Sequence, residues 1–397
     1  MSENSGERLN ILFLGASYGS LPAAKMLMAG HNVHFVCRQQ EVDLINADGF
    51  RVRITTRQDG EIEIDSRRLP GRATAKTPST LTFANFDLVC LAMAEPQYSS
   101  PEIRELLRNI GKSGVPCVSI MNMPPPPYLR RVPNLDVDGL AGAYTDIGIW
   151  RDFTTGQITL CSPDPQAIRP PGESPNVLQV TLATNFKVAK FGSPTADAIL
   201  YRLQSDFEAA RQLIRDRDVP IPVQFKVFDS AFVPFSKWPM LIAGNCRCVT
   251  RTGSRTIAEA VNNDVDESRS VFDFVQSICL RIGAHAADLV PFEKYLAASR
   301  SLTRASSSAR ALDAGAIAIE RADKLVQLLG GSLGVNHPVV DNVVAVIDFA
   351  ARTEPQIRIG KMIGASRLIR NFSHLSQEQY PKVSIGLSSH CFRCAAR

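Results

Sequence analysis

Apolar runs alternate with small-residue turns most clearly in the first forty residues of the chain. Apolar runs at residues 11–14 and 33–36 flank a stretch rich in Ala, Leu and Met, which starts after Gly15 and ends at Gly30. Pro22 stands near the start of this stretch, where a helix tolerates proline. Strand, tight turn, helix and strand in this order are typical of a nucleotide-binding βαβ unit. The pattern therefore predicts that the chain opens with a cofactor site.

The turn after the first strand matches a dinucleotide fingerprint only in part. The pattern G-x-G-x-x-G would place glycines where Ser17 and Ser20 stand. Glycine permits a sharp turn and a close approach of the backbone to a pyrophosphate at the positive end of a helix. Ser17 is small and can donate its hydroxyl to a phosphate. An ordinary βα turn without a nucleotide is the alternative. The candidate cofactor-binding residues of the turn are Gly15, Ala16, Ser17, Tyr18, Gly19 and Ser20.

The residues after the second strand refine the choice of cofactor. An NAD site usually has Asp or Glu there to bind the ribose hydroxyls. This chain has Cys37, Arg38 and two glutamines, and the first acid is Glu41. A guanidinium suits a 2′-phosphate through paired, charge-assisted hydrogen bonds. Arg38 therefore indicates NADP as the cofactor, and a solvated surface arginine is the alternative.

The α/β rhythm continues through the first half of the chain and then gives way to helices. Residues 87–92 and 115–121 are predicted strands, residues 102–110 a helix, and residues 177–188 a further strand-like run. Four prolines at 124–127 predict a stiff loop, and the Pro-rich residues 162–175 a surface loop. Helical periodicity dominates from Pro239 onward. Predicted helices there cover residues 257–260, 270–282, 313–329 and 339–350.

This organisation predicts an α/β N-terminal Rossmann-like domain followed by an all-α C-terminal domain. We place the NADP-binding domain at residues 1–227 and a helical substrate and dimerisation domain at residues 228–397. The last thirty or so residues are rich in Ser, Arg and Cys, which is typical of a loosely packed tail. The apolar helices between residues 270 and 350 offer an interface, so we expect a homodimer.

Composition narrows the class of protein. Hydrophobic residues make up 45% of the 397 residues and charged residues 21%, and the net charge of +5 is dispersed, so no nucleic-acid partner is expected. No apolar run has the length of a membrane span, and the first ten residues lack a signal-peptide core. Nine scattered cysteines predict reduced thiols in a cytoplasmic protein. Cys246, Cys248, Cys391 and Cys394 lack the paired spacing of a zinc site, so we expect no metal.

Four segments together resemble the ketopantoate reductase family, which reduces 2-dehydropantoate with NADPH. The first is the opening βαβ unit with Arg38, followed by EVDLINADGFRV. The second is VSIMNM around Asn122, which is similar to the family strand that ends in an asparagine. The third is FSKWPMLIAGN at residues 235–245. The fourth is SSSARALDAGAIAIE at residues 306–320, followed by LGVNHPVVD. Each motif is short, and their shared order carries the resemblance.

The resemblance implies a role for residues that match the family motifs. Lys237 matches the general acid that protonates the forming alkoxide, and Glu320 the glutamate that orients the lysine and the substrate hydroxyl. Asn122 matches the asparagine near the nicotinamide and the substrate. Asn245 matches an asparagine that holds the substrate. Ser307 or Ser308 matches the serine that binds the substrate carboxylate.

The residues around Lys237 support this role independently. Ser236 can cap a helix and Pro239 suits its first turn, so Lys237 is predicted at a helix N-terminus. The positive helix end and partial burial would both lower the lysine pKa and help it to donate a proton. The alternatives are ordinary structural roles: a solvated Lys237, a Glu320 that pairs with Lys324 on a helix surface, and a buried Asn245 bonded to backbone.

Departures from the family fall near the expected substrate site. Leu241 replaces the first helix asparagine, and Met93 stands where the family often has a lysine. The chain is also longer than a typical member, around residues 125–220 and at the C-terminus. A reductase of a 2-oxo acid or related carbonyl compound is the first interpretation. An opine-type or imine-forming dehydrogenase, or a non-catalytic NADP-binding regulatory protein, are the alternatives.

Overall fold

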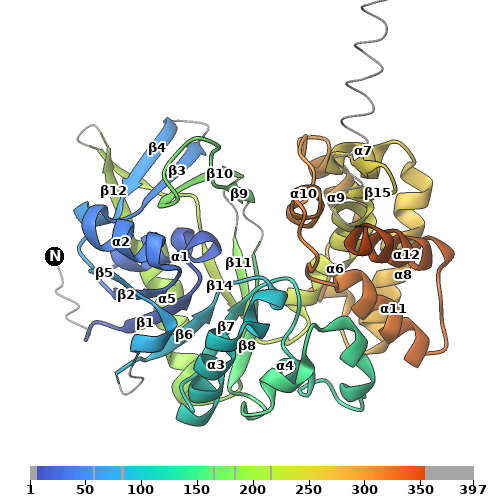
Figure 1. The fold of residues 1–397 in the computed structure, drawn as a ribbon, viewed down its shortest axis with the longest axis horizontal. Coiled ribbons are helices and arrows are strands. Elements are labelled where there is room, and N and C mark those ends of the chain that lie inside the picture. The colour runs from blue at the N-terminus through green and yellow to red at the C-terminus, as the bar shows by residue number, and fades with distance from the viewer. Residues whose placement is uncertain are drawn as a thin grey trace, which may run out of the picture. The chain divides into compact units, whose positions relative to one another are not determined.

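A sheet of eight strands carries the N-terminal half, and its strand order reverses beside the first strand. The strands are β1 (Asn10–Leu14), β2 (Asn32–Val36), β5 (Ala73–Lys76), β6 (Leu88–Leu91), β7 (Cys117–Ile120), β8 (Ile158–Pro163), β11 (Phe186–Ala189) and β14 (Phe225–Phe228). Their order is β14-β11-β8-β7-β6-β1-β2-β5, with parallel neighbours except at β8 and β11 (Figure 1). The chain therefore places β6 and β2 on opposite sides of β1.

The computed structural model describes residues 7–56, 59–81, 85–163, 166–182, 185–214 and 217–353. The predicted C-terminal tail, with Cys391 and Cys394, lies outside the described residues. Up to Ala351 the described chain belongs to one compact unit. In this part of the chain no helix is both long and apolar enough to cross a membrane.

Other elements cover both faces of the main sheet. Every residue of β1 after Asn10 is apolar, so this strand has side chains to bury on each face. Ile11 and Phe13 point to one layer, which contains helices α1 (Ala16–Met28) and α5 (Pro194–Ala209). Leu12 and Leu14 point to the other layer, which contains α3 (Pro101–Ser113). Parallel strands buried on both faces read as continuous apolar runs, which explains why these strands were predicted correctly.

A second sheet corrects two predictions about the middle of the chain. Its strands are β4 (Gly60–Asp65), β3 (Arg51–Thr56), β10 (Val177–Leu182) and β9 (Gln166–Ile168), in this order. The predicted surface loop at residues 162–175 is wrong in part, since β8 extends to Pro163 and β9 lies within it. The predicted run 177–188 is two strands, β10 and β11, which belong to different sheets. β9 depends on pairing with β10, β10 on pairing with β3, and β11 on pairing with β8 and β14, and composition alone does not reveal such pairing.

The structure of the segment with the four prolines also differs from the prediction. A short helix, α4 (Pro126–Leu129), begins inside the predicted stiff loop. Proline fits the first turn of a helix because the first N–H groups have no partner there. Residues 126–129 are buried, so the segment packs inward as it leaves β7.

Among the described residues after β14, the regular structure is helical apart from the small hairpin of β15 (Val249–Thr250) and β16 (Gly253–Ser254). The α-helices are α6 (Trp238–Met240), α7 (Ile257–Asn262), α8 (Val265–Arg281), α9 (Phe292–Ser299), α10 (Ser307–Asp313), α11 (Ala322–Ser332) and α12 (Pro338–Arg352). The predicted fold class is confirmed. The single helix predicted at residues 313–329 is wrong, because α10 ends at Asp313 and α11 starts at Ala322.

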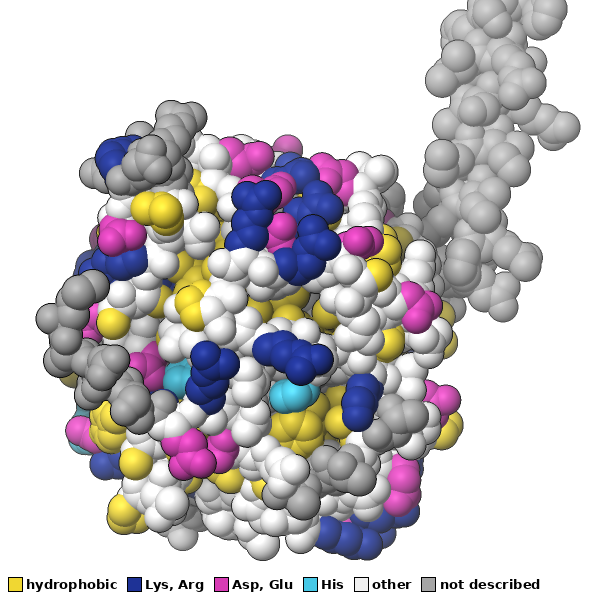
Figure 2. All heavy atoms as spheres, turned by 90° about the vertical axis from the view of Figure 1, so that its left-hand side faces the viewer, with side chains coloured by type: hydrophobic (Ala, Val, Ile, Leu, Met, Phe, Trp, Pro, Cys, Tyr) yellow, Lys and Arg dark blue, Asp and Glu magenta, His cyan; other side chains and the backbone are white. Residues whose placement is uncertain are grey.

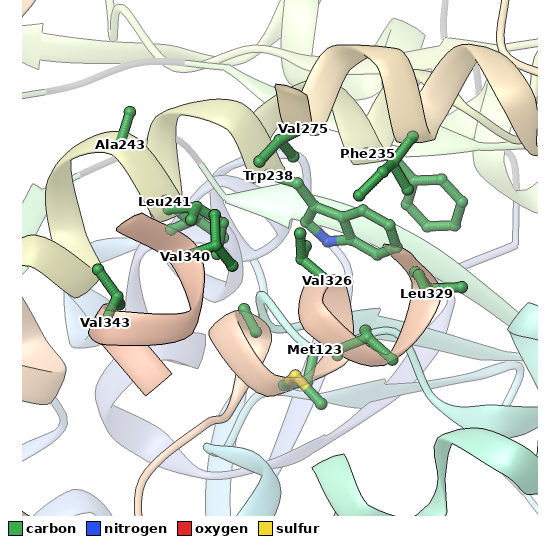
Figure 3. Close-up of a cluster of buried hydrophobic side chains, with 14 of the residues drawn as sticks. Met123, Phe235, Trp238, Leu241, Ala243, Val275, Val326, Leu329, Val340 and Val343 are labelled. Atoms are coloured by element: carbon green, nitrogen blue, oxygen red, sulfur yellow. The ribbon is translucent and has the colours of Figure 1, made fainter. Parts of the chain in front are cut away.

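One apolar cluster joins the segment after β7 to these helices. Met123 packs with Trp238, Val326 and Leu329 in the cluster drawn in Figure 3. Phe235 stacks on Trp238 with ring centroids 4.3 Å apart. The cluster therefore draws residues from both sides of the expected boundary at 227/228, which stays a prediction.

We predict that Gly15→Ala destabilises the protein more than Gly30→Ala does. Both glycines have a positive φ, which costs an alanine about 1–2 kcal/mol. A Cβ at Gly15 would also lie 2.7 Å from the Ala92 carbonyl oxygen, whereas nothing lies within 4 Å of one at Gly30. Denaturant unfolding of both variants measures the difference. Equal losses would show that the turn relaxes without cost.

Candidate active site

The carboxyl ends of β1 and β6 open into a cavity of about 740 Å³. It lies where the strand order reverses, which is the usual ligand crevice of a doubly wound sheet. Its lining comprises Gly15, Ala16, Ser17, Tyr18, Val36, Cys37, Arg38, Gln39, Glu41, Thr77, Pro78, Ser79, Ala92, Met93, Gln97, Ser100, Glu102, Ile103 and Arg169. The volume and the lining both suit a small organic ligand with charged groups.

The predicted phosphate-binding turn divides into two parts. Residues 15–18 line the cavity, and α1 starts there, so its first N–H groups have no partner within the helix. Gly19 is not in the cavity lining. A Cβ on it would lie 2.8 Å from Cδ1 of Phe13, so it permits close packing of helix on strand. The Ser20 hydroxyl donates to the Ala16 carbonyl inside the helix. Only the first four turn residues therefore face the ligand space.

Arg38 shares a carboxylate with an arginine that sequence reasoning missed. Nε of Arg38 donates to Oε2 of Glu41 at 3.1 Å, and Arg169 donates to the other oxygen of Glu41. Burial opposes ionisation of Glu41, but the hydrogen bonds from Arg169 and Arg38 hold its pKa below the ordinary value. Arg169 follows β9, inside the predicted surface loop, and no sequence signal distinguished it.

A second group of polar side chains gathers at the ends of β6 and β7. Nδ2 of Asn122 donates to Oε2 of Glu320 at 3.1 Å. The other amide atom, Oδ1 of Asn122, is buried and has no hydrogen-bond partner within the described residues. Burial raises the pKa of Glu320 to about 7, although hydrogen bonds from Asn122 and from the Glu95 backbone oppose the shift. The structure thus brings together two of the predicted site residues, although 198 positions separate them.

Glu95 adds a second buried carboxyl beside Glu320. It is fully buried and accepts hydrogen bonds from the Thr145 backbone at 3.0 Å and from its hydroxyl at 2.9 Å. Burial raises the pKa of Glu95, and its charge raises that of Glu320 in turn. Sequence reasoning missed Glu95, because an acid after a strand has many ordinary roles.

The helix of the predicted serines approaches the phosphate-binding turn. Burial raises the Tyr18 pKa although 41% of the residue is exposed, and the Ser307 side chain lies near enough to oppose this shift. Ser307 is exposed and Ser308 half-buried, while the buried Ser306 caps α10 by accepting from the Ala309 backbone at 3.2 Å. Tyr18 therefore connects the cavity to the predicted substrate residues.

The ion pair between Glu320 and Lys324, which was the alternative to a functional role for Glu320, does not form. Glu320 precedes α11 in a non-helical segment, and Nζ of Lys324 donates to Gln327 at 2.8 Å. The helix α6 does begin directly after Lys237, with Pro239 in its first turn, but other helical backbone precedes it. Helical backbone already begins with a 3₁₀ turn, η6 (Val233–Lys237), and Ser236 makes no side-chain cap. The helix dipole therefore gives Lys237 no advantage, since the effect fades within the first turn.

Lys237 and Asn245 are both half-buried on this helical stretch. The stretch continues through α6 into a π-helical turn, η7 (Leu241–Asn245), which ends at Asn245. Such turns are rare and often lie at functional sites. Leu241 is buried at the start of the same turn. The roles of Lys237, Asn245, Ser307 and Ser308 stay predictions.

No family model matches the sequence, and no curated protein matches it either. Solved structures do match. A protein described as a ketopantoate reductase from Ralstonia solanacearum MolK2 has a TM-score of 0.62 at 18% identity, over 86% of this chain and 98% of its own. The 2-dehydropantoate 2-reductase from Methylococcus capsulatus has a TM-score of 0.57 at 15% identity, over 88% and 99%. A D-mandelate dehydrogenase with NADH and anilino(oxo)acetate has a TM-score of 0.56 at 13% identity, over 86% of this chain and 98% of its own.

This chain has the ketopantoate reductase fold. The resemblance that the sequence motifs indicated is thereby confirmed for the fold. Identity this low says nothing about substrate, because one fold hosts many activities. Within the ketopantoate reductase fold, a function for this chain must be argued from its own site. Across the described residues, no cluster of His, Cys, Asp or Glu could hold a metal ion.

We predict that Glu320→Gln, compared with the unaltered protein, is more favourable to stability at neutral pH than at acid pH. Because the folded pKa of about 7 exceeds the unfolded value near 4.5, the protonated carboxyl favours folding below pH 4.5, and this advantage is lost as pH rises through 7. The unfolding midpoint of the variant minus that of the unaltered protein should therefore rise between these values and then level off.

The matched control is Glu208→Gln, at an exposed position near the end of α5. Thermal unfolding of the three proteins across this pH range provides the measurement. If the difference in unfolding midpoint between Glu320→Gln and the unaltered protein is the same at every pH, Glu320 titrates alike in the folded and unfolded chains.

Proposed function

We propose that this chain is an NADPH-dependent reductase of a 2-oxo acid or a related carbonyl compound. The observation that carries the proposal is the buried Glu320–Asn122 pair at the end of β7. Tyr18 lines the cavity, and the charge of Glu320 acts to raise the Tyr18 pKa, so the pair lies near the ligand space. A carboxyl that titrates near neutrality beside a dinucleotide crevice suits acid–base chemistry.

The residues present fit a nicotinamide dinucleotide. The turn at residues 15–18 supplies backbone N–H groups for the pyrophosphate. The buried Oδ1 of Asn122, unpartnered in the described chain, suits the amide N–H of a nicotinamide carboxamide. Arg38 suits a 2′-phosphate, which supports NADP. A bound NADPH would supply the hydride for the carbonyl carbon.

In this proposal the residues of the chain bind the substrate and move its proton. Lys237 donates a proton to the carbonyl oxygen as the alcohol forms. Glu320 orients the lysine and the substrate hydroxyl, and Asn122 holds the Glu320 carboxylate through its Nδ2 at 3.1 Å. Ser307, Ser308 and Asn245 hold the substrate.

Two apolar replacements favour a less polar substrate than 2-dehydropantoate. Met93 lines the cavity and Leu241 is buried, where the family resemblance implies lysine and asparagine. An amine co-substrate requirement would instead favour an opine-type dehydrogenase. Tight NADPH binding without turnover on a broad carbonyl panel would favour a non-catalytic regulatory protein.

We also propose that the protein is a cytoplasmic homodimer. One solved neighbour, from Staphylococcus aureus, is described as a dimeric ketopantoate reductase, with a TM-score of 0.56 at 9% identity. In this chain Leu280 and Phe349 are nearly half exposed on α8 and α12, which suits pairing of the helical parts. Basic and acidic side chains lie next to one another on the face in Figure 2, which gives no hint of a nucleic-acid surface there.

We predict that NADPH binds at least tenfold more tightly than NADH, a difference of about 1.4 kcal/mol. The charge-assisted contact of Arg38 with a 2′-phosphate is the reason. Fluorescence titration of both cofactors measures the affinities, and Arg38→Ala should remove most of the difference. Equal affinities in the unaltered protein would contradict NADP preference.

Lys237→Ala should lower kcat by roughly 10² to 10⁴, the range for loss of a general acid. NADPH affinity should hardly change, because the proposed role of Lys237 is at the carbonyl and not at the phosphates. Lys237→Arg should not restore turnover, since a guanidinium keeps its proton. Steady-state kinetics on the best carbonyl substrate of a panel provide the measurement. Full kcat in Lys237→Ala would show that another group donates the proton.

A further inference from the structure

We propose that Arg169 is a second specificity-determining residue for a phosphate on the ribose 2′ position of the cofactor. This inference rests on the proposed function and deepens it. Arg169 comes from the segment between β9 and β10, within the part of the chain that is longer than a typical ketopantoate reductase. The binding pocket for this phosphate would then be formed by two separate parts of the chain.

The geometry begins with the position of Arg169 in the dinucleotide cavity. Arg38 and Arg169 both line it, and each donates to one oxygen of the Glu41 carboxylate. The Glu41 side chain is only 8% exposed, whereas that of Arg169 is 27% exposed and that of Arg38 is 81% exposed. The carboxylate is therefore buried behind two guanidinium groups that still face the cavity.

The balance of charge and donors favours a phosphate over ribose hydroxyls. Two guanidinium groups and one carboxylate leave a net positive charge at this corner of the cavity. Both Glu41 oxygens already accept hydrogen bonds from arginine, so the charge of this acid is offset within the protein. The Nη atoms of Arg38 have no hydrogen-bond partner in the described part of the chain, and a guanidinium carries five N–H donors in all. These donors suit the oxygens of a phosphate.

Arg169 is held in place by the second sheet. β10 pairs in parallel with β3, which directly follows α2 (Gln39–Asp48), the helix that carries Glu41. The Arg51 backbone donates to the Asn176 carbonyl at 2.9 Å, and Nδ2 of Asn176 donates to the Gly49 carbonyl at 2.7 Å. Arg53 also bridges to Glu173 at 2.5 Å. The strands β3 and β10 lie side by side in Figure 1, so the segment that carries Arg169 is anchored beside α2.

The test compares two ligands that differ only in the 2′-phosphate. Adenosine 2′,5′-bisphosphate and adenosine 5′-monophosphate are titrated calorimetrically into the full-length protein and into Arg169→Ala. The variant should bind the bisphosphate about tenfold more weakly, as expected for loss of a charge-assisted contact, and the monophosphate as before. NADPH and NADH should show the same contrast.

Two further variants separate this role from a structural one. Arg217→Ala removes the ion pair with Asp59 but lies outside the cavity lining and outside the contacts that anchor Arg169, so it should leave both affinities unchanged. Arg169→Lys retains the charge without the paired donors, so its loss for the bisphosphate should be intermediate. The thermal midpoint of each variant verifies that it folds, and Arg169→Lys serves as the test if Arg169→Ala does not.

Three results would overturn the inference. Equal weakening of both ligands in Arg169→Ala or Arg169→Lys would assign Arg169 a structural role. Loss of discrimination in Arg38→Ala with none in either Arg169 variant would leave Arg38 as the only phosphate contact, and the proposed function would still stand. If the unaltered protein binds neither these nucleotides nor NADPH, the proposed function is wrong, and the inference is wrong with it.

Discussion

The hydrogen bond between Asn122 and Glu320 is the contact on which the candidate active site depends. It joins the segment after β7 to the segment before α11, so the Rossmann-like part and the helical C-terminal part of the chain are connected at one carboxyl. Burial of that carboxyl is costly unless donors surround it, and here the Asn122 side chain and backbone N–H groups supply them. The raised pKa reflects the part of this cost that the donors do not offset. It leaves Glu320 able to exchange a proton near neutral pH.

The cofactor end of the cavity depends on a different constraint, which is close packing of backbone. Gly15 turns the chain with a φ of 101° against Ala92, and Gly19 lets α1 lie on Phe13. These contacts bring the start of α1 to the ends of β1 and β6, where its free N–H groups can meet a phosphate. The arginines at the other end of the cavity come from the residue directly before α2 and from the segment after β9. The ligand space is thus formed by local turn geometry at one end and by pairing of distant strands at the other.

The sequence predicted elements whose signal is local, and it failed to predict those whose conformation depends on pairing with distant strands. The βαβ unit was predictable because its apolar strands and its glycine turn are contiguous. The motifs indicated Asn122 and Glu320, which the structure brings into contact, and their roles stay predictions. The strand β9 was not predictable, since residues 166–168 owe their conformation to β10. Arg169 was missed for the same reason. The helix α6 begins directly after Lys237, but the 3₁₀ turn η6 extends the helical backbone back to Val233, which a cap at Ser236 did not predict. No local pattern could place Glu95, whose role arises only beside Thr145 and Glu320.

A crystal structure of the protein with NADP⁺ tests the central claim most directly, namely that the cavity and the Glu320–Asn122 pair form one reductase site. The account predicts that the pyrophosphate lies at residues 15–18, the 2′-phosphate at Arg38, and the nicotinamide within hydrogen-bond distance of Oδ1 of Asn122. A dinucleotide bound outside the cavity would contradict the account. A nicotinamide bound at the Arg38 end, far from Glu320, would contradict it equally.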